Sequence, residues 1–195
     1  MKKSFQITGI ILLLVFITTY TIYKEHENEE KKINNIVGLG SSLGTLKEKY
    51  GNAKYISGGY FFEAEHIFVS TPITSTNEEL VAHLSINFES TDNPFRTLDE
   101  VLELGNTLIP PDAVKKRQND FIINEDYTET IIEYKSVQLA KLINNQELYG
   151  DAEIGTFVLH LVKYTGNELD VGYTELTIST GNPYRERYKG YDFFY

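Results

Sequence analysis

A segment near the C-terminal end reads Phe157-Val158-Leu159-His160-Leu161-Val162, and its side chains are apolar at both sets of alternating positions. A strand made of these residues would bury both of its faces, as strands in the middle of a sheet do. Residues 171–179 form a second strand-like segment, and Thr165-Gly166-Asn167 between the two predicts a turn. We therefore expect a hairpin whose first strand is central in its sheet.

Earlier in the chain, alternation and turn signals predict further strands. They cover residues 54–57, 60–64, 66–71 and 80–88. Gly58-Gly59 is a two-residue hairpin signal between the first two. The last of the four alternates well, with Leu80, Ala82, Leu84, Ile86 and Phe88 facing one way. Residues 127–134 fit a strand or a helix.

Two helix starts share one signature. Thr45-Leu46-Lys47-Glu48 and Thr97-Leu98-Asp99-Glu100 both have the T-x-x-E form of a capping box. The first helix is predicted to stop at Gly51 and the second at Pro110-Pro111. A third helix is predicted over residues 137–143.

The alternation of helices and strands predicts an α+β domain. We expect a mostly antiparallel sheet with two or three short helices on one face, preceded by an N-terminal transmembrane or signal helix. The repeated helix start also indicates two similar halves, near residues 36–90 and 91–181. The rest of the two halves does not align convincingly.

The N-terminus has the pattern of an export signal. Lys2 and Lys3 precede residues 7–23, which carry no charge. Seventeen residues is about the lower limit for a membrane span and longer than an ordinary signal-peptide core of about 7–15 residues. We interpret residues 1–23 as an uncleaved signal anchor. A cleaved signal peptide is the alternative, with Thr19-Tyr20-Thr21 as the best, though poor, cleavage site.

Charge indicates how the chain is oriented. Lys2 and Lys3 favour a cytoplasmic N-terminus, which leaves a polar linker at 24–35 and an extracytoplasmic α+β domain at 36–195. Without these two lysines the chain has 16 basic and 28 acidic residues, a formal charge of −12. Such a domain is repelled by an anionic membrane surface, and its charge argues against nucleic acid as a partner.

Residues 40–53, from Gly40 to Ala53, resemble the opening helix of a module found in exported proteins. The helix ends in Tyr50-Gly51, and strands are predicted from Lys54 to Phe88. Over residues 40–88 the pattern is similar to the helix-plus-antiparallel-strand module of small-protein-A-type assembly lipoproteins and of β-lactamase-inhibitor-like exported proteins. The lipidated cysteine of the former and the disulfides of the latter are missing. The resemblance implies a fold and a binding role without catalysis, and it carries over no functional residue.

The sequence contains no strong catalytic, metal-binding or cofactor-binding motif. The chain has no cysteine, which excludes disulfides, thiolate metal sites and a cysteine nucleophile. Its four histidines, at 26, 66, 83 and 160, have no ligand spacing. We expect His83 and His160 at the surface or edge of the sheet, although both on one face could form a site. The run Gly38–Gly44 does not have dinucleotide-loop spacing and predicts a flexible lead into a helix.

Acidic clusters lack calcium-loop spacing. We therefore predict no catalytic residue, no metal and no cofactor.

The C-terminus is dense in aromatic residues. A possible interaction surface consists of Tyr184, Arg187, Tyr188, Tyr191, Phe193, Phe194 and Tyr195. Tyrosine and arginine are enriched at interface hot spots, so this segment fits a recognition tail for a protein or a wall glycan. The alternative, which we favour, is a last strand that docks on the sheet with Tyr191, Phe193 and Tyr195 on one side.

Together these features predict a membrane-anchored, extracytoplasmic binding protein of the cell envelope without a catalytic site. Its expected partners are the membrane, through residues 7–23, and an envelope protein or wall component. One alternative is an enzyme that acts on cell-wall polymers through a carboxylate pair. Another is a secreted inhibitor or immunity-type protein, released after signal cleavage.

Overall fold

The computed structural model describes residues 18–20, 24, 37–72, 79–166 and 171–184. The chain divides into two compact units, Met1–Asn35 and Ile36–Tyr195, and the second contains the fold discussed below. No helix within the described residues is both long enough and apolar enough to cross a bilayer. Most of the predicted anchor at residues 7–23 lies outside the described residues.

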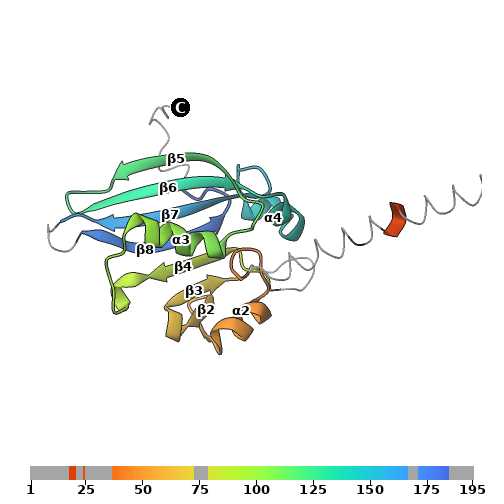
Figure 1. Cartoon of the computed structure of the whole chain (residues 1–195), viewed down its shortest axis with the longest axis horizontal. Helices are drawn as coiled ribbons and strands as arrows, with labels where there is room; N and C mark the ends of the chain where they lie inside the picture. The colour runs from red at the N-terminus through yellow and green to blue at the C-terminus, as the bar shows by residue number, and fades with distance from the viewer. Residues whose placement is uncertain (1–17, 21–23, 25–36, 73–78, 167–170, 185–195) are drawn as a thin grey trace, which may run out of the picture. The chain divides into compact units, whose positions relative to one another are not determined.

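One antiparallel sheet organises the second unit (Figure 1). Its strand order is β1-β2-β3-β4-β8-β7-β6-β5. The strands are β1 (Lys54–Ile56), β2 (Gly59–Phe62), β3 (Ile67–Ser70), β4 (His83–Asn87), β5 (Val114–Ile122), β6 (Tyr127–Lys135), β7 (Thr156–Tyr164) and β8 (Gly172–Thr180). The predicted α+β class with an antiparallel sheet is therefore confirmed.

Three α-helices accompany the sheet within the described residues: α2 (Leu43–Tyr50), α3 (Leu98–Leu108) and α4 (Val137–Leu142). Short 3₁₀ turns are η1 (Glu63–Glu65), η2 (Phe88–Ser90) and η3 (Gln146–Leu148). Buried side chains of all three helices, such as Leu46, Val101 and Leu139, belong to one hydrophobic cluster. The three helices and one face of the sheet therefore share a single core.

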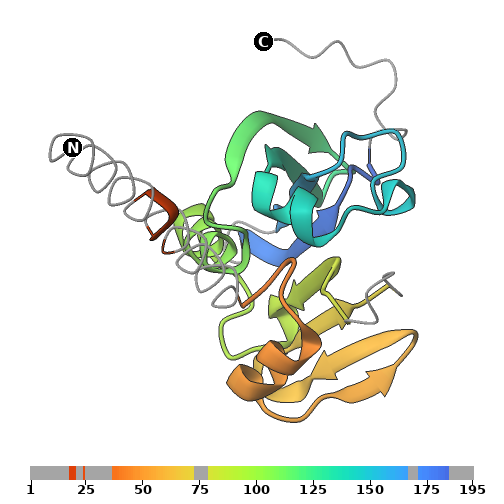
Figure 2. The same cartoon turned by 90° about the vertical axis from the view of Figure 1, so that its right-hand side faces the viewer.

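The same order of elements occurs twice. A helix followed by four antiparallel strands occurs in residues 43–87 and again in residues 98–180. Each set forms its own meander, and the last strands of the two sets, β4 and β8, pair with each other (Figure 2). The second half adds α4 and η3 between β6 and β7. We call these parts the first half and the second half.

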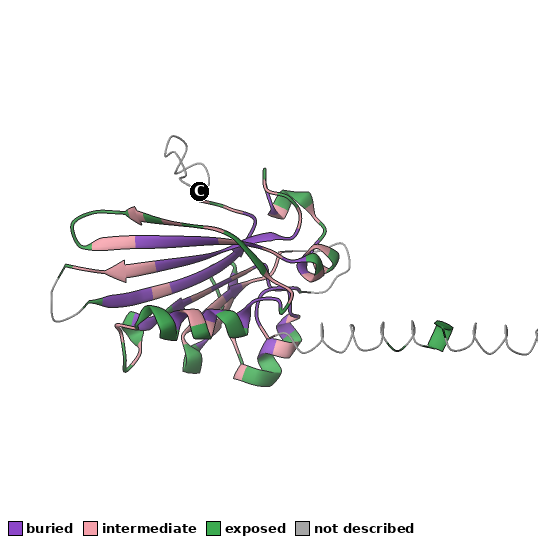
Figure 3. Ribbon diagram, turned by 45° about the horizontal axis from the view of Figure 1, so that its top comes forward, coloured by how far each residue is buried: buried purple, intermediate pink, exposed green. Residues whose placement is uncertain are grey.

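The strand with two apolar faces is central, as predicted. β7 lies between β6 and β8, and Phe157, Leu159 and Leu161 on its helix side are fully buried (Figure 3). The register places Leu159 beside Ile132 of β6 and Ile178 of β8. Residues 127–134, which were ambiguous, form β6.

Local capping distinguishes the two predicted capping boxes. At α3, the Thr97 hydroxyl accepts from Glu100 N at 3.3 Å, and the Glu100 carboxylate accepts from Thr97 N at 2.8 Å. The box at Thr45 was wrong, because α2 begins at Leu43 and is capped by Ser42, whose hydroxyl accepts from Thr45 N. Ser42 thus satisfies a free backbone N–H of the first turn, and the helix starts earlier than predicted.

Two further expectations fail for physical reasons. Residues 38–44 are not a flexible lead, because Leu39 is fully buried and its N–H bonds to the Leu108 carbonyl at 2.8 Å. The first hairpin turns at Ser57-Gly58, both with positive φ, so Gly59 already belongs to β2. β5 was not predicted, because it is an edge strand with an exposed, largely polar sequence.

Candidate functional site

The sheet face opposite the helices carries most of the polar side chains that the strands bury. We call it the open face. Because side chains alternate along a strand, the neighbours of Leu159 and Leu161 on β7 point to it. Residues on it include Arg117, Asn119, Phe121, Glu129, Ile131, Glu133, Val158, His160, Glu175, Thr177 and Ser179 of the second half, and Phe61, Phe68, His83 and Ser85 of the first.

A histidine–carboxylate pair joins β6 and β7 on the open face. His160 Nε2 is 2.6 Å from Glu129 Oε2, and the two residues are only 7% and 3% exposed. The Tyr184 ring lies over the imidazole, with ring centroids 4.3 Å apart. His160 Nδ1 is buried without a hydrogen-bond partner. The prediction that His160 lies at the surface or edge of the sheet is therefore wrong.

His83 lies on the same face as His160, which is the arrangement that a site shared by the two would require. Its Nδ1 is 2.6 Å from Ser179 Oγ, and burial lowers its pKa, while the charge of Glu175 raises it to a smaller extent. β8 lies between the strands of His83 and His160, so the two rings belong to separate polar groups. The described residues contain no group of three or more potential metal ligands.

The rim of the open face combines charge and aromatic surface. Arg117 Nη2 lies 2.6 Å from Glu133 Oε2, which also accepts from Asn182 Nδ2 at 2.9 Å. Phe121 and Tyr184 pack against a small cluster of Ile131 and Val158. The sequence did not predict this group, because β5 was missed and the strand pairing was unknown.

The structure places one residue of the predicted C-terminal surface. Tyr184 is half-buried and contacts the open face through His160. Arg187, Tyr188, Tyr191, Phe193, Phe194 and Tyr195 lie outside the described residues.

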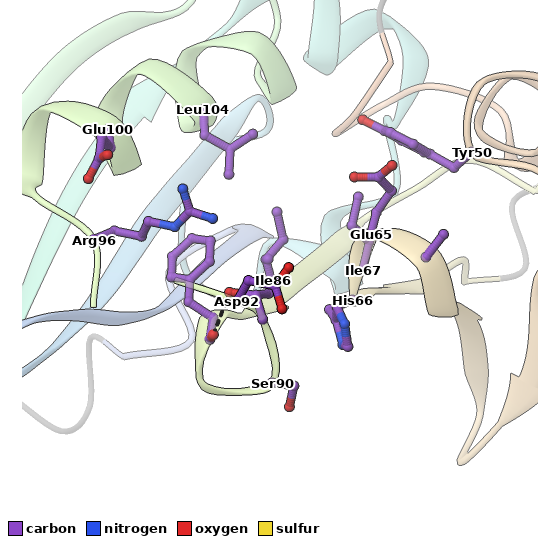
Figure 4. Close-up of a pocket in the computed structure, with 13 residues that line it drawn as sticks. Tyr50, Glu65, His66, Ile67, Ile86, Ser90, Asp92, Arg96, Glu100 and Leu104 are labelled. Carbon is purple, nitrogen blue, oxygen red and sulfur yellow. Dashed lines mark hydrogen bonds between the residues drawn. The ribbon is translucent and has the colours of Figure 1, made fainter. Parts of the chain in front are cut away.

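A cavity of about 460 Å³ lies on the helix side, where the two halves meet (Figure 4). The first half contributes residues from the end of α2, η1 and the strands β3 and β4, and the second contributes α3 and the segment before it. Ile67, Ile86 and Phe88 are buried residues of its lining. Glu65 and Arg96 lie on opposite walls.

Arg96 is a polar residue of this cavity whose backbone is held by β8. Its backbone N–H and carbonyl both bond to Tyr173, at 3.0 and 2.8 Å. Its guanidinium carbon is 5.6 Å from the centre of the Phe88 ring, and its Nε is buried without a partner. Hydrogen bonds from the Thr97 backbone N–H and hydroxyl lower the pKa of nearby Glu100, with a smaller contribution from the charge of Arg96.

Comparison of the chain with protein-family models, with curated proteins and with solved structures gives no match. The open face and the cavity are thus defined by their geometry in this chain. Sequence reasoning pointed to two of the residues involved, His160 and Tyr184. It did not single out Glu129 or Arg96, because neither lies in a recognisable motif.

Proposed function

We propose that the chain is an N-terminally anchored, extracytoplasmic binding protein of the cell envelope, and that the open face of its second half is the contact surface. The observation that carries the proposal is the composition of this face. Helices cover the other side of the sheet, whereas Arg117, Phe121 and Tyr184 are half-exposed here. Aromatic residues and arginine are the side chains most enriched in protein interfaces.

The N-terminal sequence supports the proposed location. Lys2 and Lys3 precede the uncharged residues 7–23, and the remaining chain carries a formal −12. This arrangement favours an N-terminus in the cytoplasm and a domain held away from the anionic membrane surface. A secreted inhibitor is the alternative, and determining the first residue of the mature protein distinguishes the two.

The state of the carboxylates supports binding over hydrolysis. A glycosidase acid needs a carboxyl group whose pKa is raised. Glu100, which lines the cavity, has its pKa lowered and holds the first turn of α3. The resemblance of residues 40–88 to the exported helix-plus-strand module also supports a binding role. The proposed binding role requires no cofactor.

Photocrosslinking in intact cells tests the contact surface. A photoreactive residue replaces Asn119, which is half-buried on the open face, in the full-length chain. The matched control replaces Asn106, which is exposed on α3. We expect a defined adduct from position 119, identified by mass spectrometry as an envelope protein or a wall fragment.

An equal adduct pattern from positions 119 and 106 contradicts the proposed surface. The enzymatic alternative is tested separately by incubating purified full-length protein with wall polymer and measuring released fragments. Turnover together with no adduct above background from position 119 favours the enzyme.

A further inference from the structure

The cavity between the two halves contains a guanidinium group, that of Arg96, which forms no direct ion pair within the described residues. Its Nε lacks an acceptor there. A guanidinium has five N–H donors and prefers a planar carboxylate or phosphate. Both backbone hydrogen bonds to Tyr173 fix the position from which this side chain starts. The backbone is thus held in place, the guanidinium lies 5.6 Å from the centre of the Phe88 ring, and Nε is available to an anionic group.

A simple anion does not fit the rest of the lining. Glu65, Asp92 and Glu100 also line the cavity, so acidic groups outnumber Arg96. Glu100 is already bound by the backbone and hydroxyl of Thr97, which leaves Glu65 and Asp92 as acceptors for a ligand. A plain anion is repelled by these two carboxylates, and a plain cation leaves Arg96 unmatched.

The volume of the cavity and the residues that line it further restrict the class of ligand. About 460 Å³ lies within the range of roughly 300–1,000 Å³ typical of small-molecule sites. Ile67, Ile86 and Phe88 provide an apolar surface between the charged groups, and Figure 4 shows Glu65 across the cavity from Arg96. The ligand therefore needs opposite charges at its two ends and a small apolar body between them.

We propose that this cavity binds a small zwitterion of the amino-acid or short-peptide class, with its carboxylate on Arg96 and its ammonium group between Glu65 and Asp92. The site lies on the helix side of the sheet and is distinct from the open face. Binding bridges the two halves, because Glu65 belongs to the first half and Arg96 lies just before α3, the first element of the second half.

Calorimetric titration of the full-length chain in mild detergent with L-alanyl-L-alanine tests the proposal. We expect saturable binding that Arg96→Gln weakens by roughly tenfold to a hundredfold, because a charge-assisted hydrogen-bonded contact is lost. Lys116→Gln, which removes a positive charge from the exposed edge strand β5, is the control and keeps wild-type affinity. Leu104→Trp fills the cavity from α3 without altering Arg96 and abolishes binding.

Two modified dipeptides assign the ends of the ligand. We expect the C-terminal amide to lose binding as strongly as Arg96→Gln does, and the N-acetyl form to bind clearly more weakly than the parent. Circular dichroism verifies that each variant is folded. The proposal is overturned if no heat of binding is seen with folded wild-type protein, or if Leu104→Trp binds as wild type. It is also overturned if the amide or the acetyl form matches the parent dipeptide.

Discussion

The two halves of the sheet share an order of elements but differ in how much of each strand they bury. β1 to β4 have three, four, four and five residues, whereas β5 to β8 have nine each. All residues of β1 are exposed, and all residues of β8 except Glu175 are buried. The comparison indicates that the second half is the more stable part of the sheet, and that the first half is joined to it through the pairing of β4 with β8.

The largest expected loss of stability comes from truncating a buried phenylalanine, and each half of the sheet offers one. Phe62 and Phe157 are both fully buried, one in each half. Each Phe→Ala change is expected to cost about 3–5 kcal/mol through lost burial and a cavity. Phe157→Ala should lower hydrogen-exchange protection throughout the sheet, because β7 is central. Phe62→Ala should lower it mainly in β1 to β3, and equal loss in β7 would show that the halves open as one.

One hydrogen-bonded carboxylate in each half tests whether burial differs between the halves. Removing Glu129 leaves His160 Nε2 buried without its hydrogen-bond partner, so Glu129→Ala is expected to cost about 1–3 kcal/mol in chemical denaturation. The Lys54–Glu63 pair of the first half has the same 2.6 Å separation, but both side chains are 68% exposed. Glu63→Ala should therefore leave the denaturation midpoint unchanged within error. A similar loss of stability in both variants would contradict the proposed difference in burial between the two halves.

The contact between the segment before α2 and the end of α3 is tested at Gly38. A Cβ at this position would overlap the Leu108 carbonyl at the end of α3. Gly38→Ala should therefore destabilise the protein by about 1–3 kcal/mol, as overpacking does. At Gly44 in α2 a Cβ meets only ordinary contact, so Gly44→Ala should be neutral or slightly stabilising. A neutral Gly38→Ala would mean that residues 38–40 are free to move away from α3.

The smallest effect is a dependence of stability on pH. Burial lowers the pKa of His83 in the folded state, whereas the unfolded chain titrates near its ordinary value of about 6.5. Below that value the unfolded state holds more protons, so stability falls as pH decreases through it. Thermal unfolding between pH 7.5 and 5.5 should show a smaller loss for His83→Asn than for wild type. His66→Asn serves as the control, and an unchanged slope in His83→Asn contradicts the assignment.

The sequence predicted the elements that carry a strong local signal. Residues 157–162 indicated a central strand because both faces are apolar, and Thr97 with Glu100 marked a helix start. β5 was missed because its solvated edge position permits a run of Lys, Arg, Gln and Asn that resembles a loop. The Thr45 capping box was wrong because Ser42 caps the same turn earlier.

The candidate sites could not be predicted, because they depend on contacts between distant segments. His160 and Glu129 are 31 positions apart and meet only once β6 pairs with β7. The cavity combines η1 with α3, which belong to different halves. Periodicity identifies the faces of a strand, but it does not identify the neighbouring strand.

The absence of cysteine in the chain permits a direct test of the proposed location and contact surface. Single cysteines replace Asn106 on α3 and Asn119 on the open face, and intact cells are treated with a maleimide that does not cross membranes. We predict that position 106 is labelled in cells, and that position 119 is protected there but labelled in the purified protein. Labelling of neither position until the cells are lysed would contradict an extracytoplasmic domain. Equal labelling of both in intact cells would contradict an occupied open face.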